Sequence, residues 1–556
     1  MAILVLTSLV ALCIVAVTAF KVFIISKSSN LQLDRTIDTL QTVTKAHASP
    51  LSRIPNAGWG AGYSRLIWAF RQEYRGNVTL ELPKLHETLG SPVFPLKPLT
   101  RVATDSIVLL GPLIRIGPNE LSFYSIDIYD TVHKVNSGFV KDPRNYGEFV
   151  QDEHPALFSI TDPQEHAKRR RILGQLFSRS NIEKLEGLML HHIDNFVSAV
   201  ERRSVSFDIG PACRALEADI ICETPRYDSA LPLSAVSAWS KGEEVALVSK
   251  NDEKATFLPL MMNFPLLYST WVRVEDFLCH IEGLRTSSKK GLQQYDEWTH
   301  KAWVRNKDPG RKSQFPNLLN VMVSAGVPTQ TALSEAKENL GPGTDTTSAS
   351  LAHILYALSW NPTYQQKLYK DLASHGFPTD FNTLENIPRL RACVKEGIRW
   401  AGASVAMLPR VVPKGGVELC GNFVPEGTIV TSSPVWYLRD KYAYPNPELF
   451  NPYRWIDDYG LNTTEDVLRD KFYIAFSKGA NTCIANHFSY LELYMSVAKM
   501  VANFEISPAN ERHGPAQVAG LSNADWQPVQ LPKRKEWVSA VVTEPLLIKT
   551  VPRRHV

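Results

Sequence analysis

A glycine-containing segment that ends in a cysteine constrains this chain more than any other feature. Residues 476–485 read Phe-Ser-Lys-Gly-Ala-Asn-Thr-Cys-Ile-Ala, and an amphipathic run follows them through Phe504. The apolar side chains of that run recur at helical spacing. We therefore predict that Cys483 lies at a helix N-terminus, where backbone amides and the helix dipole stabilise a thiolate. Such a thiolate suits a metal ligand or a nucleophile, and the alternative is a buried structural cysteine.

The other cysteines and the charge balance narrow the possibilities. The 556 residues contain 7 cysteines, an odd number, widely spaced and without a C-x-x-C pair. This pattern indicates neither a disulfide framework nor a structural zinc site, and it favours a reducing compartment. The 60 basic and 56 acidic residues leave a net charge of only +4. A nucleic-acid partner is not expected, because nucleic-acid binding needs a concentrated basic surface.

The N-terminus carries one apolar run. Ala2 to Phe20 contains no charged residue, and lysines follow at positions 21 and 27. A helix of this length spans roughly 28 Å, near the thickness of the bilayer core. Because the positive charges follow the run, we expect residues 1–26 to be a transmembrane anchor with the rest of the chain in the cytoplasm. A cleaved signal peptide is the alternative, but it would need a basic region before the apolar run.

The remainder is predicted to be mostly helical. Residues 27–52 indicate a linker, and long helices are expected from about 160 to 400. Length alone would suggest three or four domains. Short strands are expected around the Pro118-Asn119 turn and within Gly416–Val430. Residues 91–110 combine three prolines with an apolar run. They form a doubtful insertion, either a surface loop or an artefact of the gene model.

Three further segments bear on chemistry. Residues 339–347 read Asn-Leu-Gly-Pro-Gly-Thr-Asp-Thr-Thr inside a helical pattern, where the glycines and the proline predict a kink. Hydroxyls beside a carboxylate at such a turn can hold water and relay protons. Glu396 and Arg399 form an i, i+3 pair, which alone indicates only an ion pair. Phe450–Trp455 is an aromatic and arginine turn about thirty residues before Cys483.

In this order, these segments resemble the cytochrome P-450 family of haem-thiolate monooxygenases. The family's cysteine loop, F-x-x-G-x-R-x-C-x-G, matches Phe476, Gly479 and Cys483. Its A-G-x-D-T-T helix, its E-x-x-R pair and its arginine turn match the other three segments. The amino-acid sequences of Val411–Val430 and Tyr444–Trp455 are most similar to those of fungal family members that act in secondary metabolism. The resemblance implies a mostly α fold with a small β part. In this fold a single large domain, expected over residues 53–556, encloses haem behind one N-terminal transmembrane helix.

The resemblance also assigns roles to individual residues. Cys483 would be the axial thiolate ligand of haem b, in a loop shaped by Phe476 and Gly479. Asp345 and Thr346 would deliver protons to bound dioxygen. Arg410, in Leu408-Pro409-Arg410, and the helical pair His166 and Arg170 would contact the haem propionates. Of the four basic residues 168–171, two are expected to be solvent-exposed.

The implied reaction is the oxidation of a hydrophobic small molecule, with hydroxylation as its commonest form. It would use O2 and electrons from NADPH, delivered by NADPH–cytochrome P-450 reductase. The substrate is expected to be a terpenoid or polyketide intermediate of fungal secondary-metabolite biosynthesis. The protein would be anchored in the lipid of the endoplasmic reticulum membrane by its single span.

Departures from the family pattern keep alternatives open. Asn481 stands where the family places arginine or histidine, Ala485 where it places glycine, and Pro342 where it places alanine. Asparagine can donate a hydrogen bond but brings no charge. A catalytically impaired haem-fold membrane protein with a binding or scaffold role is therefore a second hypothesis. A zinc or thiol hydrolase that uses Cys483 with His487 is a third.

Overall fold

A computed structural model gives the structure of the chain. It describes residues 44–89, 113–150, 153–203, 206–223, 234–243, 259–278, 318–457, 461, 466–509 and 526–553. The predicted transmembrane anchor at 1–26 and the doubtful insertion at 91–110 lie outside these residues. Within them, no helix is both long enough and apolar enough to cross a bilayer. Residues 44–53, at the end of the expected linker, include a short helix and the buried Leu51.

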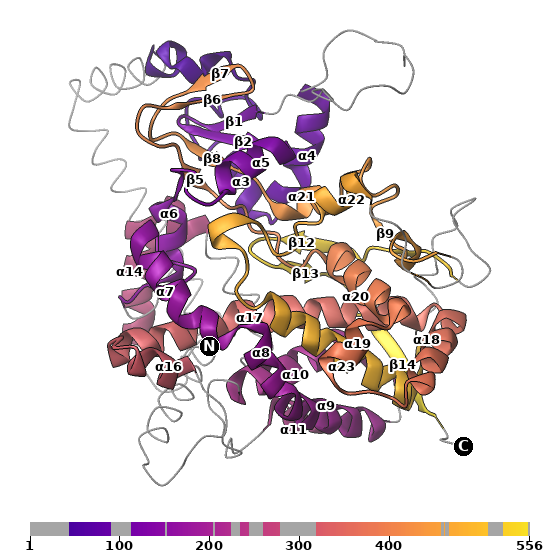
Figure 1. The fold of residues 1–556 in the computed structure, drawn as a ribbon. Helices are drawn as coiled ribbons and strands as arrows, with labels where there is room; N and C mark the ends of the chain where they lie inside the picture. Colours follow the sequence, from indigo (N-terminus) through magenta and orange to yellow (C-terminus); the bar gives the residue numbers. More distant parts are fainter. Residues whose placement is uncertain are drawn as a thin grey trace, which may run out of the picture.

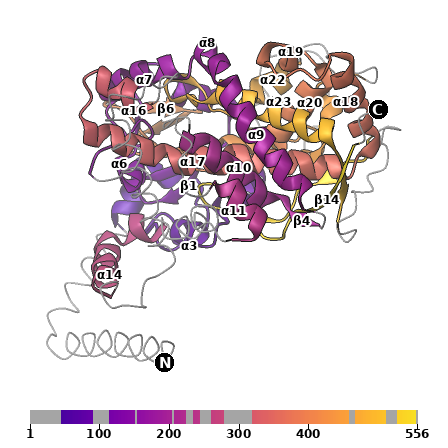
Figure 2. The same cartoon turned by 90° about the horizontal axis from the view of Figure 1, so that it is seen from below.

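Helices dominate, as the sequence predicts. The central helix is α17 (Thr329–Ser359), and α10 (Ile209–Glu223), α20 (Pro388–Ala401) and α23 (Asn486–Asn503) pack against it (Figure 1). Seen from below, α10 lies across α17 beside α9 (Glu186–Glu201) (Figure 2). The other α-helices are α3 (Ala69–Tyr74), α4 (Val78–Leu89), α5 (Ile126–His133), α6 (Pro143–Tyr146), α7 (Pro163–Leu176), α8 (Arg179–Ile182), α11 (Ala235–Lys241), α14 (Pro265–Leu278), α16 (Leu318–Ser324), α18 (Pro362–Ser374), α19 (Phe381–Glu385), α21 (Pro434–Leu438) and α22 (Val467–Phe472).

The largest sheet lies in the upper part of Figure 1 together with α3, α4 and α5, whereas β14 (Leu547–Pro552) lies among the helices of the lower part. The largest sheet has the order β1-β2-β8-β5-β3. Its strands are β1 (Leu113–Gly117), β2 (Glu120–Phe123), β3 (Val140–Lys141), β5 (Arg410–Val411) and β8 (Ile429–Thr431). Around it and the helices lie β4 (Phe207–Asp208), β6 (Val417–Leu419), β7 (Asn422–Val424), β9 (Leu449–Phe450), β10 (Phe504–Pro508), β11 (Val529–Gln530), β12 (Arg534–Glu536), β13 (Ala540–Val542) and β14 (Leu547–Pro552).

Several helices and strands predicted from the sequence are present in the structure, with ends close to the predicted ones. The strands around Pro118-Asn119 are β1 and β2, and the amphipathic run after Cys483 is α23, which ends one residue before Phe504. The helix that carries Glu396 and Arg399 is α20. α17 ends before Asn361, and Pro362 opens α18, where its fixed φ is compatible with the first helical turn.

The glycine–proline stretch in α17 does not end that helix. Helical backbone is continuous from Thr329 to Ser359. Gly343 instead allows α10 to approach, because a Cβ added there would overlap Cδ1 of Ile221. Gly397 of α20 serves the same purpose on another face, where an added Cβ would overlap Ile354 of α17. The two glycines therefore set the spacing of three helices.

This spacing predicts the effect of one added methyl group. Gly397→Ala should lower the free energy of unfolding by about 1–3 kcal/mol, because close-packed helices accommodate extra volume poorly. Gly174→Ala in α7 is the matched control, since an added Cβ meets nothing within 4 Å there. It should be neutral or slightly stabilising, because alanine favours helix. Equal denaturant midpoints for the two variants would contradict the close approach of α17 and α20.

Candidate active site

Cys483 lies in a tight loop immediately before α23. Its amide donates a hydrogen bond to the carbonyl of Phe476 at 2.9 Å, which closes the loop over the 3-10 turn Gly479–Asn481. The Cys483 side chain is solvent-exposed. Burial among surrounding protein atoms nevertheless raises the pKa of its thiol, while the amide of Ala485 and the guanidinium of Arg170 act to lower it. The Cys483 thiol is therefore accessible to a ligand and lies near the cationic Arg170, as a thiolate metal ligand requires.

The shape of the loop depends on α5. Ser477 and Gly479 have φ of +59° and +70°, a region that favours glycine. A Cβ at Gly479 would overlap the carbonyl oxygen of His133 at the end of α5. The hydroxyl groups of Tyr129 and Ser477 are 2.7 Å apart. The loop is therefore held against α5 by backbone contact as well as by side chains.

A cluster of basic side chains, most of them buried, lies beside this loop. Lys141 of β3 and Arg410 of β5 are paired across the sheet and are only 6% and 2% exposed. Arg410 donates to the hydroxyl of Tyr146 at 2.8 Å, and Nζ of Lys141 donates to the carbonyl of Phe158 at 2.8 Å. Burial and the positive charge of Arg410 together lower the pKa of Lys141 to about 7.

The predicted pair on α7 completes the cluster. His166 is buried, and its pKa falls to about 3 because of burial and of the positive charges on Lys141, Arg170 and Arg410. Burial also lowers the pKa of Arg170, against the influence of Cys483. We call His166, Arg170, Arg410 and Lys141 the basic cluster. The positive charges of these residues act on one another, and Arg170 also interacts with Cys483. The basic cluster and the thiol therefore belong to one site.

The donor set fits an anionic, metal-containing cofactor. Desolvated like charges are costly unless an anion compensates them. The acids nearest Lys141 have other partners, since Glu335 pairs with Arg169 at 2.7 Å and Glu338 accepts from the amide of Ser159 at 3.0 Å. Asn481, two residues before Cys483, buries Oδ1 without a partner among the described residues. The site therefore combines an accessible thiol with nearby excess positive charge.

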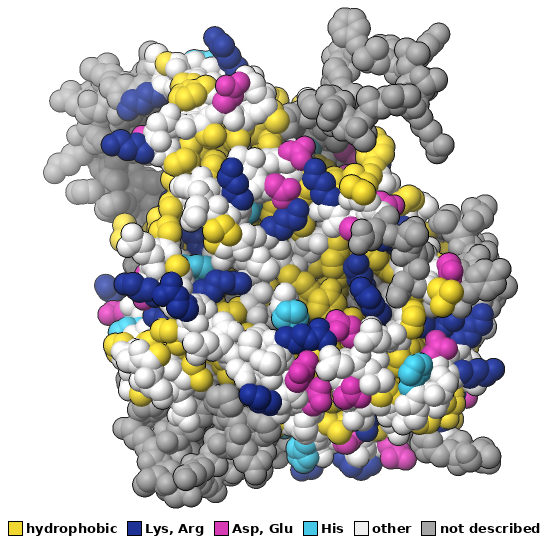
Figure 3. Space-filling model, viewed as in Figure 1, with side chains coloured by type: hydrophobic (Ala, Val, Ile, Leu, Met, Phe, Trp, Pro, Cys, Tyr) yellow, Lys and Arg dark blue, Asp and Glu magenta, His cyan; other side chains and the backbone are white. Residues whose placement is uncertain are grey.

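Two of the four basic residues 168–171 are exposed, as expected. Lys168 and Arg171 lie on the surface, where basic side chains gather over α7 (Figure 3). Arg169 is buried in its pair with Glu335, and Arg170 is half-buried. The sequence did not indicate Lys141, because a two-residue strand carries almost no pattern. Its pairing with Arg410 became visible only in the sheet.

The threonine-rich stretch of α17 lies beside α23. Asp345 pairs with Arg214 of α10, Nε to Oδ1, at 3.7 Å, and Thr346 is half-buried. The Thr347 hydroxyl lies 3.1 Å from that of Ser489 on α23. Thr347 thus links α17 to the helix that follows Cys483, and Thr346 is the more accessible of the two hydroxyl groups.

A buried ion-pair network lies behind the cysteine loop. Glu396 and Arg399 are fully buried and form two hydrogen bonds of 2.8 Å. Arg454 and the indole N–H of Trp455 also donate to Glu396, at 3.2 and 3.0 Å. Burial opposes ionisation of Glu396, but Arg399 and Arg454 keep its pKa below the usual value. The predicted E-x-x-R pair and the aromatic–arginine turn therefore meet in one structural network.

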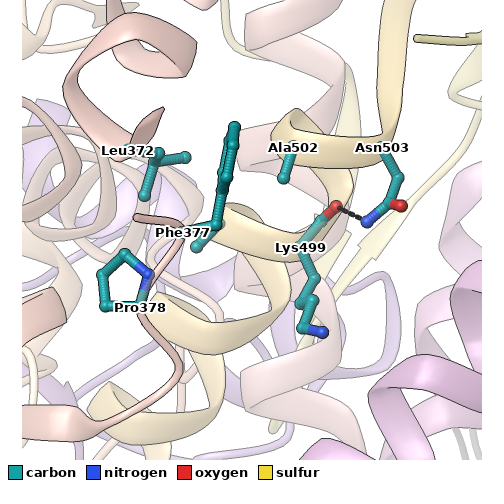
Figure 4. A pocket seen from close by; sticks show the side chains of 7 residues that line it. Leu372, Phe377, Pro378, Lys499, Ala502 and Asn503 are labelled. Atoms are coloured by element: carbon teal, nitrogen blue, oxygen red, sulfur yellow. Dashed lines mark hydrogen bonds between the residues drawn. The ribbon is translucent and has the colours of Figure 1, made fainter. Parts of the chain in front are cut away.

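Hollows lie at two places of interest. One lies between Phe377, Pro378 and the last turns of α23 (Figure 4). It includes Lys499 and Asn503, at the end of α23 remote from Cys483. The other is a partly open groove lined by Phe158, whose carbonyl accepts a hydrogen bond from Lys141. This second hollow therefore adjoins the basic cluster.

Comparison with known protein families decides the family. Residues 114–524 match the family described as Cytochrome P450. The chain belongs to the cytochrome P450 family. Cytochrome P450 monooxygenase hkm5 of Aspergillus hancockii is 26% identical over 484 residues, covering 82% of this chain and 85% of the relative. Monooxygenase macH of Penicillium terrestre is 26% identical over 493 residues, covering 82% and 87%. Pisatin demethylase of Fusarium vanettenii is 25% identical over 415 residues, covering 71% and 78%.

Membership in the cytochrome P450 family defines the reaction class. The protein is a monooxygenase with a haem-thiolate cofactor and receives electrons from a redox partner. In this family a cysteine thiolate holds the haem iron and donates electron density to it. Similarity to curated fungal monooxygenases also agrees with the predicted likeness to members of secondary metabolism.

The close contact at Gly479 predicts a loop that tolerates no side chain there. Gly479→Ala should cost about 1–2 kcal/mol in backbone strain and about 1–3 kcal/mol more from overlap with His133. Gly421→Ala is the control, because its φ of +72° matches but an added Cβ meets nothing within 4 Å. Thermal unfolding and thiol-reagent reactivity of Cys483 measure the effect. Equal losses of stability in both variants would contradict the contact with α5.

Proposed function

We propose that Cys483 binds the iron of haem b in this monooxygenase, which oxidises a hydrophobic terpenoid or polyketide in fungal secondary metabolism. The observation that carries the proposal is the accessible Cys483 thiol, which lies close enough to Arg170 of the basic cluster for the two charges to interact. When bound, haem activates dioxygen with electrons that originate from NADPH. The names of the fungal relatives support the reaction class, and the substrate class rests on the likeness in Val411–Val430 and Tyr444–Trp455.

The basic cluster would bind the two carboxylates of haem. Arg410 and Arg170 offer guanidinium donors, which suit carboxylate geometry. His166 is neutral at physiological pH because of its lowered pKa, so it would donate from one ring N–H. Lys141 brings a cation to a site where Asn481 brings none. Phe476 and Gly479 would hold the loop so that the thiol points at the metal.

On the other side of the site, α17 would handle protons. Thr346 is the side chain we propose to hold a proton donor at the oxygen-binding position. Asp345 would exchange protons with solvent and pass them to Thr346, and its ion pair with Arg214 holds the carboxylate at the surface of α17. Such relays typically contribute about 10²- to 10⁴-fold to rate.

The cellular setting follows from the same proposal. NADPH–cytochrome P450 reductase would dock on the exposed basic face that contains Lys168 and Arg171, with an affinity that falls as salt rises. Residues 1–26 would anchor the catalytic domain, residues 53–556, to the cytoplasmic side of the endoplasmic reticulum membrane. A scaffold role without catalysis is not favoured, because the cysteine loop and the Glu396 network are both complete.

Loss of the thiol tests the assignment of the metal ligand. Cys483→Ser should abolish the thiolate signature in the spectrum of the reduced, carbon-monoxide-bound protein and reduce turnover at least about a thousandfold, because an alcohol donates less electron density to the iron. Cys420→Ser, a change at an exposed cysteine in the β6–β7 turn, should leave both unchanged. Retained oxidation with an unchanged spectrum in Cys483→Ser would refute the assignment.

Loss of the Thr346 hydroxyl tests the proton relay. Thr346→Ala should reduce product formed per NADPH at least about tenfold, with a matching rise in hydrogen peroxide, because protons reach reduced oxygen at the wrong moment. Thr347→Ala removes only the contact with Ser489 and should retain coupling. If coupling is normal in Thr346→Ala, the relay lies elsewhere.

A further inference from the structure

The hollow next to the basic cluster is apolar over most of its surface. It is a groove partly open to solvent, and it lies between the α6 region, the segment that leads into α14, the residues before β5, and the turn between β12 and β13. Its apolar lining includes Val78, Phe149, Phe158, Met262, Met407 and Val538. A surface of this kind takes a hydrophobic molecule, and a few polar groups fix the orientation of the ligand.

The charged residues that line the hollow are all carboxylates, namely Glu73, Glu148 and Glu536. Glu73 accepts a hydrogen bond from Arg65 at 2.9 Å. Glu536 accepts from Arg534 at 2.8 Å and from Arg439 at 3.0 Å. Both carboxylates are thus compensated within the protein, and neither is available to orient a ligand.

Glu148 differs from the other two. It lies in the 3-10 turn η2 (Gly147–Phe149) and is half-buried, and no described residue donates a hydrogen bond to its carboxylate or pairs with it. Burial raises its pKa, and no nearby cation offsets that effect. An uncompensated carboxylate at an apolar wall is unfavourable by itself, and a ligand that supplies a donor removes the cost.

The position of Glu148 relates it to the cofactor site. The ring of Phe149, the next residue, lies 5.1 Å from that of Phe158, which in turn lies 5.2 Å from Tyr146. Tyr146 accepts the hydrogen bond from Arg410 of the basic cluster. A chain of three aromatic rings therefore connects the turn that carries Glu148 to the basic cluster. A molecule held by Glu148 would have its apolar body beside that cluster.

We propose that Glu148 determines specificity by accepting a hydrogen bond from a hydroxyl or amine group on an otherwise hydrophobic substrate. This inference rests on the proposed function, because it treats the hollow as the part of the substrate-binding site that lies beside haem. Anchoring one end of the molecule limits which of its C–H bonds can reach the reactive centre. Substrates without a donor would bind less tightly and in several orientations.

Equilibrium dialysis of the holoenzyme against three probes with one carbon skeleton tests this role. The probes are farnesane, farnesol and farnesylamine, which carry no donor, a hydroxyl donor and an ammonium donor. Glu148→Leu should weaken farnesol binding about tenfold and farnesylamine binding about 10- to 100-fold, the values typical of lost hydrogen bonds to a charged group. Farnesane binding should stay within about twofold. Glu418→Leu, at an exposed carboxylate of β6, is the control and should change none of the three.

The results separate this inference from the proposed function. A larger loss for farnesylamine than for farnesol identifies the amine as the preferred donor, and equal losses identify any donor. Unchanged binding of both donor probes in Glu148→Leu, or equal or absent binding of all three probes to the wild-type protein, would overturn the role of Glu148. If only the role of Glu148 is wrong, the protein would still bind haem and show an unchanged haem spectrum. A protein that takes up no haem would instead contradict the proposed function.

Discussion

The buried carboxylate of Glu396 is the contact on which the rest of the site depends. It accepts hydrogen bonds from Arg399, Arg454, Trp455 and the amide of Asn451. Arg399 in turn donates to three backbone carbonyls between residues 438 and 449, at 2.8–3.1 Å. One ion pair on α20 thereby fixes the long segment that precedes the cysteine loop. Breaking a buried pair of this kind typically costs about 3–5 kcal/mol, because it leaves a charge without a partner.

A second constraint acts from the sheet. The antiparallel register of β3 and β5 sets Lys141 opposite Arg410, and α7 brings His166 and Arg170 to the same space. The fold thus concentrates positive charge where it also presents a thiol. Charge of this kind destabilises the protein alone and stabilises a complex with an anion. The Glu396 network holds the cysteine loop rigid, and the unfavourable repulsion within the basic cluster favours binding of an anion. The two are complementary parts of one binding site.

The sequence predicted those features that short motifs carry. The cysteine loop, the helix after it, the E-x-x-R network and the division of residues 168–171 into exposed and buried members all appear in the structure. At the predicted kink in α17 the helical backbone continues, because Gly343 serves the approach of α10 and the packing of neighbouring helices overrides local propensity. Lys141 and Glu148 had no signal, since their roles depend on strand register and on a cavity whose walls come from segments far apart in the sequence.

The central claim is that the basic cluster and Cys483 together hold an anionic haem. Titration of the apoprotein with haem and with haem dimethyl ester tests this claim, because the ester keeps the iron and the ring but lacks both carboxylate charges. We expect the ester to bind at least about tenfold more weakly, with the difference reduced in Arg410→Gln. Equal affinities for the two compounds in the wild-type protein would contradict the account.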